Sequence, residues 1–106
     1  MIKKFINIKG GYKFKGELKN GVPNGYGMVI NDNGTRVYEG YWQNGKPHGF
    51  GTLFGKNGFK VYEGEWTNGL IHGQGKAFMF GDKEKLYEGE FSFGKPQVNL
   101  DILTKP

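Results

Sequence analysis

Glutamates recur at fixed places in this 106-residue chain, and carboxylates are well suited to acid–base chemistry. Catalysis by paired carboxylates needs surroundings that raise the pKa of one member. These glutamates instead return in each copy of a short motif, which is better explained by ion pairs and turn contacts. We therefore predict an acidic row without catalytic function, in a chain that is not an enzyme. The row comprises Glu17, Glu39, Glu63, Glu65, Glu88 and Glu90.

Two histidines, His48 and His72, occupy the same position of this motif. If each copy contributes two strands, equivalent positions are two strand spacings apart, roughly 10 Å. A shared zinc ion needs both imidazoles within about 2.1 Å of the metal. We therefore predict a turn-stabilising role for the histidines, and neither a metal nor a cofactor. The absence of cysteine excludes disulfides and thiol catalysis.

Residues 40–46 and 89–95 both imitate a phosphate-binding loop, because each runs from a glycine to a Gly-Lys pair. In a phosphate-binding loop the next residue is a serine or threonine that binds magnesium, and a helix follows. Here Pro47 and Pro96 stand in that place. The similarity is a coincidence of the repeated motif.

The repetition itself is the most informative feature of the sequence. The segment Tyr-Glu-Gly-Tyr-Trp-Gln-Asn-Gly at 38–45 returns as Tyr-Glu-Gly-Glu-Trp-Thr-Asn-Gly at 62–69, with further copies beginning at Phe14 and Tyr87. A fixed period of this size predicts a stacked array. The expected units are a basic half-repeat cap at 1–13, repeats at 14–37, 38–61 and 62–86, and a truncated repeat with a C-terminal cap at 87–106.

Each repeat has the pattern of a β-hairpin. Apolar and polar residues alternate with period two, and the dipeptide Asn44-Gly45 suits a tight turn with positive φ angles. Pro47 cannot donate to a strand ladder, so we expect it to keep the connection out of the sheet and the second strand to begin at Gly51. The predicted fold is all-β: a single-layer, curved antiparallel meander of about three and a half hairpins, with almost no helix.

Paired glycines inside the strands need a physical reason, because glycine in a strand interior costs stability. Gly40 and Gly64 each lie between aromatic positions of one face, and Gly51 and Gly75 lie on the following strands. Aromatics make up 16% of the chain, whereas all hydrophobic residues reach only 36%. We predict that the glycines make room for rings, and that an aromatic ladder packed on glycine backbone replaces a second layer.

The ends of the array are expected to differ from its interior. Residues 5–8 fit the second strand of a preceding hairpin, and residues 97–103 fit a variant closing strand. Lys3, Lys4 and Lys9 guard the first edge, whereas the closing strand carries a single charge, Asp101. Exposed edges recruit partners. The C-terminal strand is therefore the expected place for a homodimer or for an added partner strand.

The repeats resemble the membrane occupation and recognition nexus (MORN) repeat, whose units read close to Tyr-Glu-Gly-Glu-Trp-x-Asn-Gly-x-x-His-Gly-x-Gly. Residues 62–75 are nearly a consensus copy, and the resemblance covers residues 14–96. Departures include Tyr41 in place of the usual glutamate and the missing second half of the fourth unit. The resemblance implies an elongated sheet of hairpins that acts as a scaffold for proteins or, in some members, anionic phospholipids, with any enzymatic activity in appended domains.

Aromatic residues of the array are the candidate partner-binding site. A single-layer sheet cannot hide both faces from water, and tyrosine and tryptophan anchor many interfaces. We therefore expect a protein-binding scaffold that engages a protein partner through an aromatic groove. The candidate residues are Tyr38, Tyr41, Trp42, Tyr62, Trp66, Tyr87 and Phe91.

The net charge of +5 is concentrated at the N-terminal end. This leaves two alternatives open: binding to an anionic phospholipid surface, or inhibition of a larger machine that handles nucleic acid. No segment has the pattern of a secretion signal or a membrane span, so we expect a cytoplasmic location, peripheral to a membrane if the lipid alternative holds. The basic residues are Lys3, Lys4, Lys9, Lys13, Lys15 and Lys19.

Overall fold

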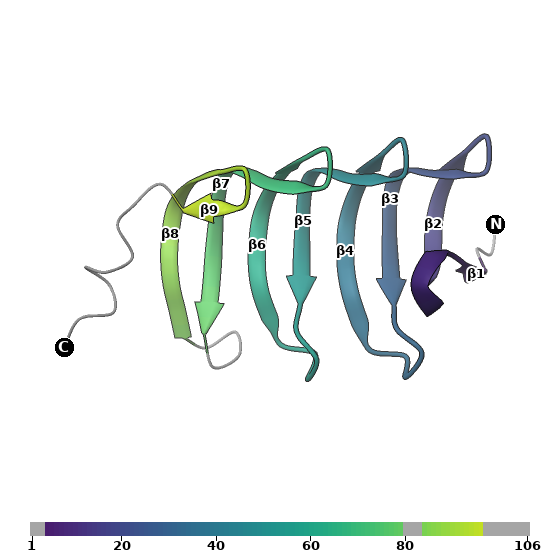
Figure 1. Cartoon of the computed structure of the whole chain (residues 1–106), viewed down its shortest axis with the longest axis horizontal. Helices are drawn as coiled ribbons and strands as arrows, with labels where there is room; N and C mark the ends of the chain where they lie inside the picture. The colour runs from purple at the N-terminus through teal and green to yellow at the C-terminus, as the bar shows by residue number, and fades with distance from the viewer. Residues whose placement is uncertain (1–3, 80–83, 97–106) are drawn as a thin grey trace.

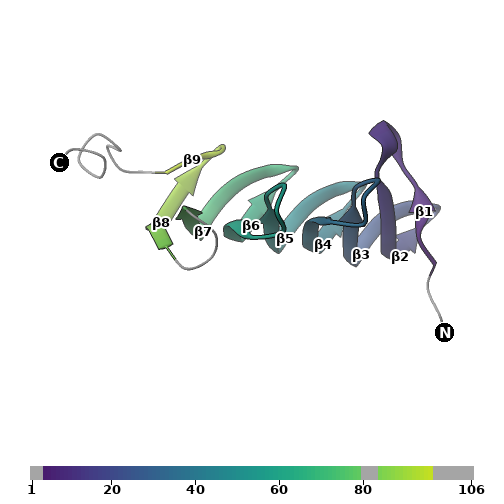
Figure 2. The same ribbon diagram turned by 90° about the horizontal axis from the view of Figure 1, so that it is seen from below.

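The computed structural model describes residues 4–79 and 84–96, which form one open antiparallel sheet with the nine strands in sequence order (Figure 1). The strands follow one another in a single row, as Figure 2 shows. This confirms the predicted all-β meander. The strands are β1 (Ile6–Asn7), β2 (Lys13–Lys19), β3 (Val22–Ile30), β4 (Arg36–Gln43), β5 (Lys46–Phe54), β6 (Lys60–Thr67), β7 (Leu70–Met79), β8 (Glu84–Ser92) and β9 (Lys95–Pro96).

Each repeat is a hairpin closed by a two-residue turn. Asn44 and Gly45 have φ angles of 52° and 81°, and both central residues of a type I′ turn need positive φ. Equivalent pairs close the β2–β3 and β6–β7 hairpins. In the last hairpin Phe93 takes the place of asparagine, with φ 50°. The asparagine–glycine turns predicted from the sequence are confirmed.

The predicted start of the second strand was wrong. β5 begins at Lys46, directly after the turn, and Pro47 lies inside the strand opposite Trp42. Pro47 is tolerated there because it lies at the start of the strand, beside a register shift. Its carbonyl accepts the Gly69 N–H of the next repeat at 2.8 Å. The same strand bends at Gly49, where φ is 97°, and the register shifts between Gly40 and Trp42.

The N-terminal strand agrees with its prediction only in part. β1 spans two residues, with Ile6 paired to Phe14, and is followed by a three-residue 3₁₀-helix, η1 (Lys9–Gly11). The predicted closing strand at 97–103, together with its proposed edge contact, lies outside the described residues.

An unbroken ladder of aromatic rings runs along one face of the sheet. Neighbouring rings meet edge to face, with centroids 5.1–5.5 Å apart. This geometry is favourable for aromatic pairs and links all the hairpins into one core. In spatial order the ladder is Phe14, Trp42, Tyr38, Trp66, Tyr62, Phe91 and Tyr87.

The strand glycines make room for this ladder, as predicted. A Cβ on Gly64 would lie 2.5 Å from the Cα of Gly75 on the neighbouring strand and 2.7 Å from the Tyr62 hydroxyl. The Tyr62 ring therefore lies across bare backbone, and its hydroxyl donates a hydrogen bond to the Glu65 carbonyl at 2.8 Å. Tyr38 and Tyr87 repeat this contact at the carbonyls three residues further on.

Hydrogen bonds between repeats fix the stacking of the array. The Trp66 Nε1–H donates to the Gly51 carbonyl of the preceding repeat at 3.1 Å, and Trp42 makes the equivalent bond to Gly27. These bonds explain why tryptophan, rather than any other large apolar residue, stands at this position in the two central repeats.

Candidate functional site

The sheet presents two different surfaces, because successive side chains of a strand point to opposite faces. The ladder face carries the aromatic ladder with Val29, Leu53 and Ala77. The open face carries the residues between them, such as Glu39 and Tyr41. Each face is a separate candidate for binding.

An apolar hollow of about 240 Å³ lies on the ladder face. The rings of Tyr38, Trp42 and Trp66 line it, together with Leu53 and further apolar residues. Ile8 and Tyr12, on either side of the short helix η1, complete the lining at the N-terminal end of the array. The lining residues are all apolar or aromatic, so the hollow suits an apolar side chain of a partner.

The candidate partner-binding aromatics are distributed over both faces. Trp42 and Tyr87 are half-buried, whereas Tyr41 is 52% exposed and lies on the open face. The remaining four residues are at most 7% exposed, so their main role is to stabilise the ladder. A partner can reach only those ring edges that line the hollow. These four are Tyr38, Tyr62, Trp66 and Phe91.

Two exposed aromatic residues on the open face were missed from the sequence. Tyr26 and Phe50 are 38% and 55% exposed and lie on the strands that flank Tyr41. The Tyr26 and Tyr41 rings meet edge to face at 5.3 Å. The sequence signal that could have identified them is the middle position of the Gly-x-Gly motif. The first two repeats carry aromatic residues there, and the third carries Gln74.

The glutamates of the acidic row have structural partners. Glu39 and Glu63 form ion pairs with Arg36 at 2.8 Å and Lys60 at 3.2 Å. Glu65 accepts the backbone N–H of Gln74 at 2.6 Å. Glu17 accepts an equivalent N–H on β3, and Gln74 donates its side-chain amide to Glu90.

Glu39 also accepts a hydrogen bond from the Tyr26 hydroxyl at 2.8 Å. This bond is the main reason that the pKa of Tyr26 is raised, because ionisation would place a phenolate against a carboxylate. The carboxylate therefore orients an exposed ring.

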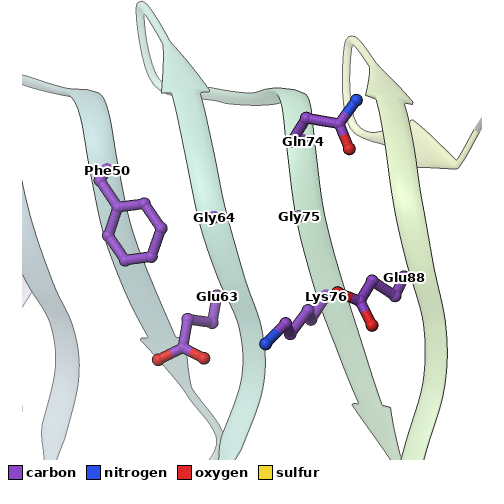
Figure 3. A pocket seen from close by; sticks show the side chains of 7 residues that line it. All are labelled: Phe50, Glu63, Gly64, Gln74, Gly75, Lys76 and Glu88. Atoms are coloured by element: carbon purple, nitrogen blue, oxygen red, sulfur yellow. The ribbon is translucent and has the colours of Figure 1, made fainter.

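A shallow hollow of about 190 Å³ lies over the backbone of β6 and β7 on the open face (Figure 3). Figure 3 shows Glu63, Lys76 and Glu88 side by side across β6, β7 and β8, with Phe50 nearby on β5. The charged side chains that line this hollow alternate in sign, and the hollow is open to solvent. The site therefore gives no support to catalysis.

The histidines contact the turn of the following repeat. His48 Nδ1 accepts the Asn68 N–H at 3.1 Å, and His72 Nδ1 accepts the Phe93 N–H at 3.2 Å. Asn24 does the same for Asn44 through its amide oxygen. The predicted turn-stabilising role is confirmed. In the described ranges, no group of three or more histidines and carboxylates is arranged to hold a metal ion.

The described basic residues at the N-terminal end do not converge on one cavity, since Lys15 and Lys19 line separate hollows. The Lys15 ammonium lies 5.3 Å from the centre of the Phe5 ring, a cation–π contact within the protein. Lys3 lies outside the described residues. The others, all exposed, are Lys4, Lys9, Lys13, Lys15 and Lys19.

Comparison with known protein families identifies the family of this chain. A family model for the MORN repeat matches four stretches of the chain, at 14–36, 38–59, 62–77 and 87–99. The chain belongs to the MORN repeat family. A search of curated proteins found no match to it.

MORN repeats are non-enzymatic binding units, linked to scaffold roles at proteins and membranes. In the part of the chain that the structure describes, no helix is long and apolar enough to cross a membrane.

Proposed function

We propose that this chain is a protein-binding scaffold module that holds an apolar segment of a partner protein on its ladder face. The observation that carries this proposal is the apolar hollow beside Trp42 and Leu53. A soluble monomer gains nothing in stability from leaving such a surface open, and burying it against a partner is favourable.

The ladder prepares this surface for binding. Its rings are held edge to face and by indole hydrogen bonds, so few side chains lose freedom when a partner binds. Val37 and Tyr12 line the hollow without belonging to the ladder. They can therefore be altered with less risk to the fold.

Site-specific photo-crosslinking tests this function. A benzoylphenylalanine replaces Tyr12, which lines the hollow, and in a matched control it replaces Phe59, an exposed ring beside the turn between β5 and β6. Both proteins are irradiated in an extract of the source cells. We expect a discrete protein adduct from position 12 alone. Adducts of equal yield from both positions, or none from position 12, would contradict the proposal.

Attachment to anionic phospholipid through the basic end is the second candidate, supported by the exposure of its described lysines. Exposed charges are screened within about 10 Å at 0.1 M salt, so lipid binding should weaken steeply as salt rises. Flotation with phosphatidylserine vesicles at low and high salt measures this. Vesicle binding that persists at high salt would contradict an electrostatic contact. Regulation of a nucleic-acid-handling machine has no separate structural support among the described residues.

A further inference from the structure

A row of side chains crosses the open face at the level of Tyr41, and every member is acidic, aromatic or an amide. The register aligns it: Tyr26 pairs with Tyr41, and Phe50 pairs with Glu65. We call this set the Tyr41 row. Its members, in strand order from β2 to β8, are Glu17, Tyr26, Tyr41, Phe50, Glu65, Gln74 and Glu90.

The centre of the Tyr41 row is an exposed aromatic patch. In the neighbouring repeats a glutamate stands at the position of Tyr41 and accepts a backbone N–H, as Glu17 and Glu65 do. Tyr41 replaces that capping group with a ring. Gly49 lies next to Tyr41 and has no side chain. A Cβ on Gly49 would lie 3.3 Å from the Tyr41 Cβ, so the glycine leaves room for the ring. Three adjacent strands thus present rings to solvent.

Carboxylates stand at both ends of this patch. Glu17 on β2 and Glu65 on β6 are four strand spacings apart, roughly 19 Å at about 4.8 Å per strand. Each accepts a backbone N–H with one oxygen, and a carboxylate has about four lone-pair sites. Both side chains are exposed and can therefore accept further bonds from a ligand.

We propose that the Tyr41 row binds a basic, extended segment of a partner protein across the strands. Lysine or arginine side chains of that segment meet Glu17 and Glu65, and the apolar residues between them lie on the rings of Tyr26, Tyr41 and Phe50. A span of roughly 19 Å corresponds to about six extended residues. Aromatic faces attract cations as well as apolar stems, so both parts of such a segment find matching groups.

Charge decides between the occupants. Phosphates of nucleic acid or lipid would lie against Glu17 and Glu65 at the ends of the patch and be repelled. Lys15 lies beside Tyr26 outside the row, and its ammonium is held over the Phe5 ring at 5.3 Å. In the adjacent row Glu39 and Glu63 already have Arg36 and Lys60 as partners, so the cation-accepting groups are those of the Tyr41 row. This surface lies on the face opposite the apolar hollow, and the two can be tested independently.

The probe is a seven-residue peptide with lysine at both ends and leucine and tyrosine between them, titrated into ¹⁵N-labelled protein. We expect amide shifts at Tyr41, Phe50 and Glu65. We also expect a Kd about tenfold higher for Tyr41→Glu and for Phe50→Gln. Both substitutions install residues that the third repeat carries at the same positions, so thermal melts should show a retained fold. Phe59→Ala, at an exposed ring outside both surfaces, should leave the Kd unchanged.

Tyr41→Glu also distinguishes binding through the aromatic rings from binding through charge. Tyr41→Glu adds a negative charge, so tighter peptide binding in this variant would show that charge alone acts and would overturn the proposal. Absent peptide binding, shifts confined to the ladder face, or equal binding of a peptide with glutamate in place of both lysines would also overturn it. Phosphatidylserine vesicles or a single-stranded oligonucleotide that displace the shifts at the Tyr41 row would favour an anionic occupant instead.

Discussion

Substitution of Gly64 by valine tests the reason for the strand glycines. The new Cβ would lie 2.5 Å from both the Gln74 carbonyl oxygen and the Gly75 Cα, roughly 1 Å short of ordinary contact. Neither backbone group can move without disturbing the β6–β7 pairing, and the Tyr62 hydroxyl, 2.7 Å away, would also be displaced. Overpacking of this kind costs about 1–3 kcal/mol, and loss of the hydrogen bond of Tyr62 adds about 1 kcal/mol.

The expected destabilisation is therefore about 3 kcal/mol, on the order of 10–20 °C in Tm for a domain of this size. Differential scanning calorimetry of parent and variant measures it. Gly55→Ala is the control, because Gly55 also lacks a positive φ and its new Cβ would make one tight contact, with the end of the Val61 side chain at 3.3 Å, and ordinary contacts with Asn57 and the Phe59 carbonyl at 3.7 and 3.8 Å. A Gly64→Val protein that melts with the parent would refute the glycine-backed ladder.

Three further perturbations probe the array. His48→Ala should cost about 1 kcal/mol in urea unfolding, whereas His48→Asn, which installs the residue of the first repeat, should cost less than half of that. Trp66→Phe should lower stability by about 1–2 kcal/mol, because a buried carbonyl loses its indole donor; an unchanged unfolding midpoint would argue against the bond. Burial raises the pKa of Tyr62 to about 12 and also raises that of Tyr38. Their contribution to stability is therefore complete below pH 10 and is lost as pH rises towards 12, which ultraviolet absorbance and circular dichroism should show as joint ionisation and unfolding.

The repeat made most of the fold predictable. Three sequence features each predict one structure: the 24-residue period, the asparagine–glycine dipeptides and the glycine pairs. The observed hairpin turns and the aromatic ladder agree with these predictions. The strand boundary at Pro47 was not predictable from the residue alone. A missing N–H excludes proline only where the ladder needs that donor, and Pro47 lies at a strand start beside a register shift.

The binding surfaces were only partly predictable. Period-two alternation placed Tyr41 and Trp42 on opposite faces, and the glycine pairs predicted a ladder on one of them. How much of each ring the ladder covers depends on ring orientation over the backbone, which the sequence does not specify. Phe50 was missed because its motif position is variable; simple alternation from Gly51, which lies under the Tyr38 ring, places Phe50 on the open face.

The most direct test of the central claim is the affinity for the crosslinked partner, measured at rising salt in paired valine variants. Val37 lines the hollow, and Val61 occupies the same position of the next repeat outside it. We predict that Val37→Asp raises the Kd at least about tenfold, that Val61→Asp leaves it within about twofold, and that parent binding changes little between 50 mM and 500 mM salt. A Kd that rises steeply with salt and is insensitive to Val37→Asp would contradict binding through the ladder face.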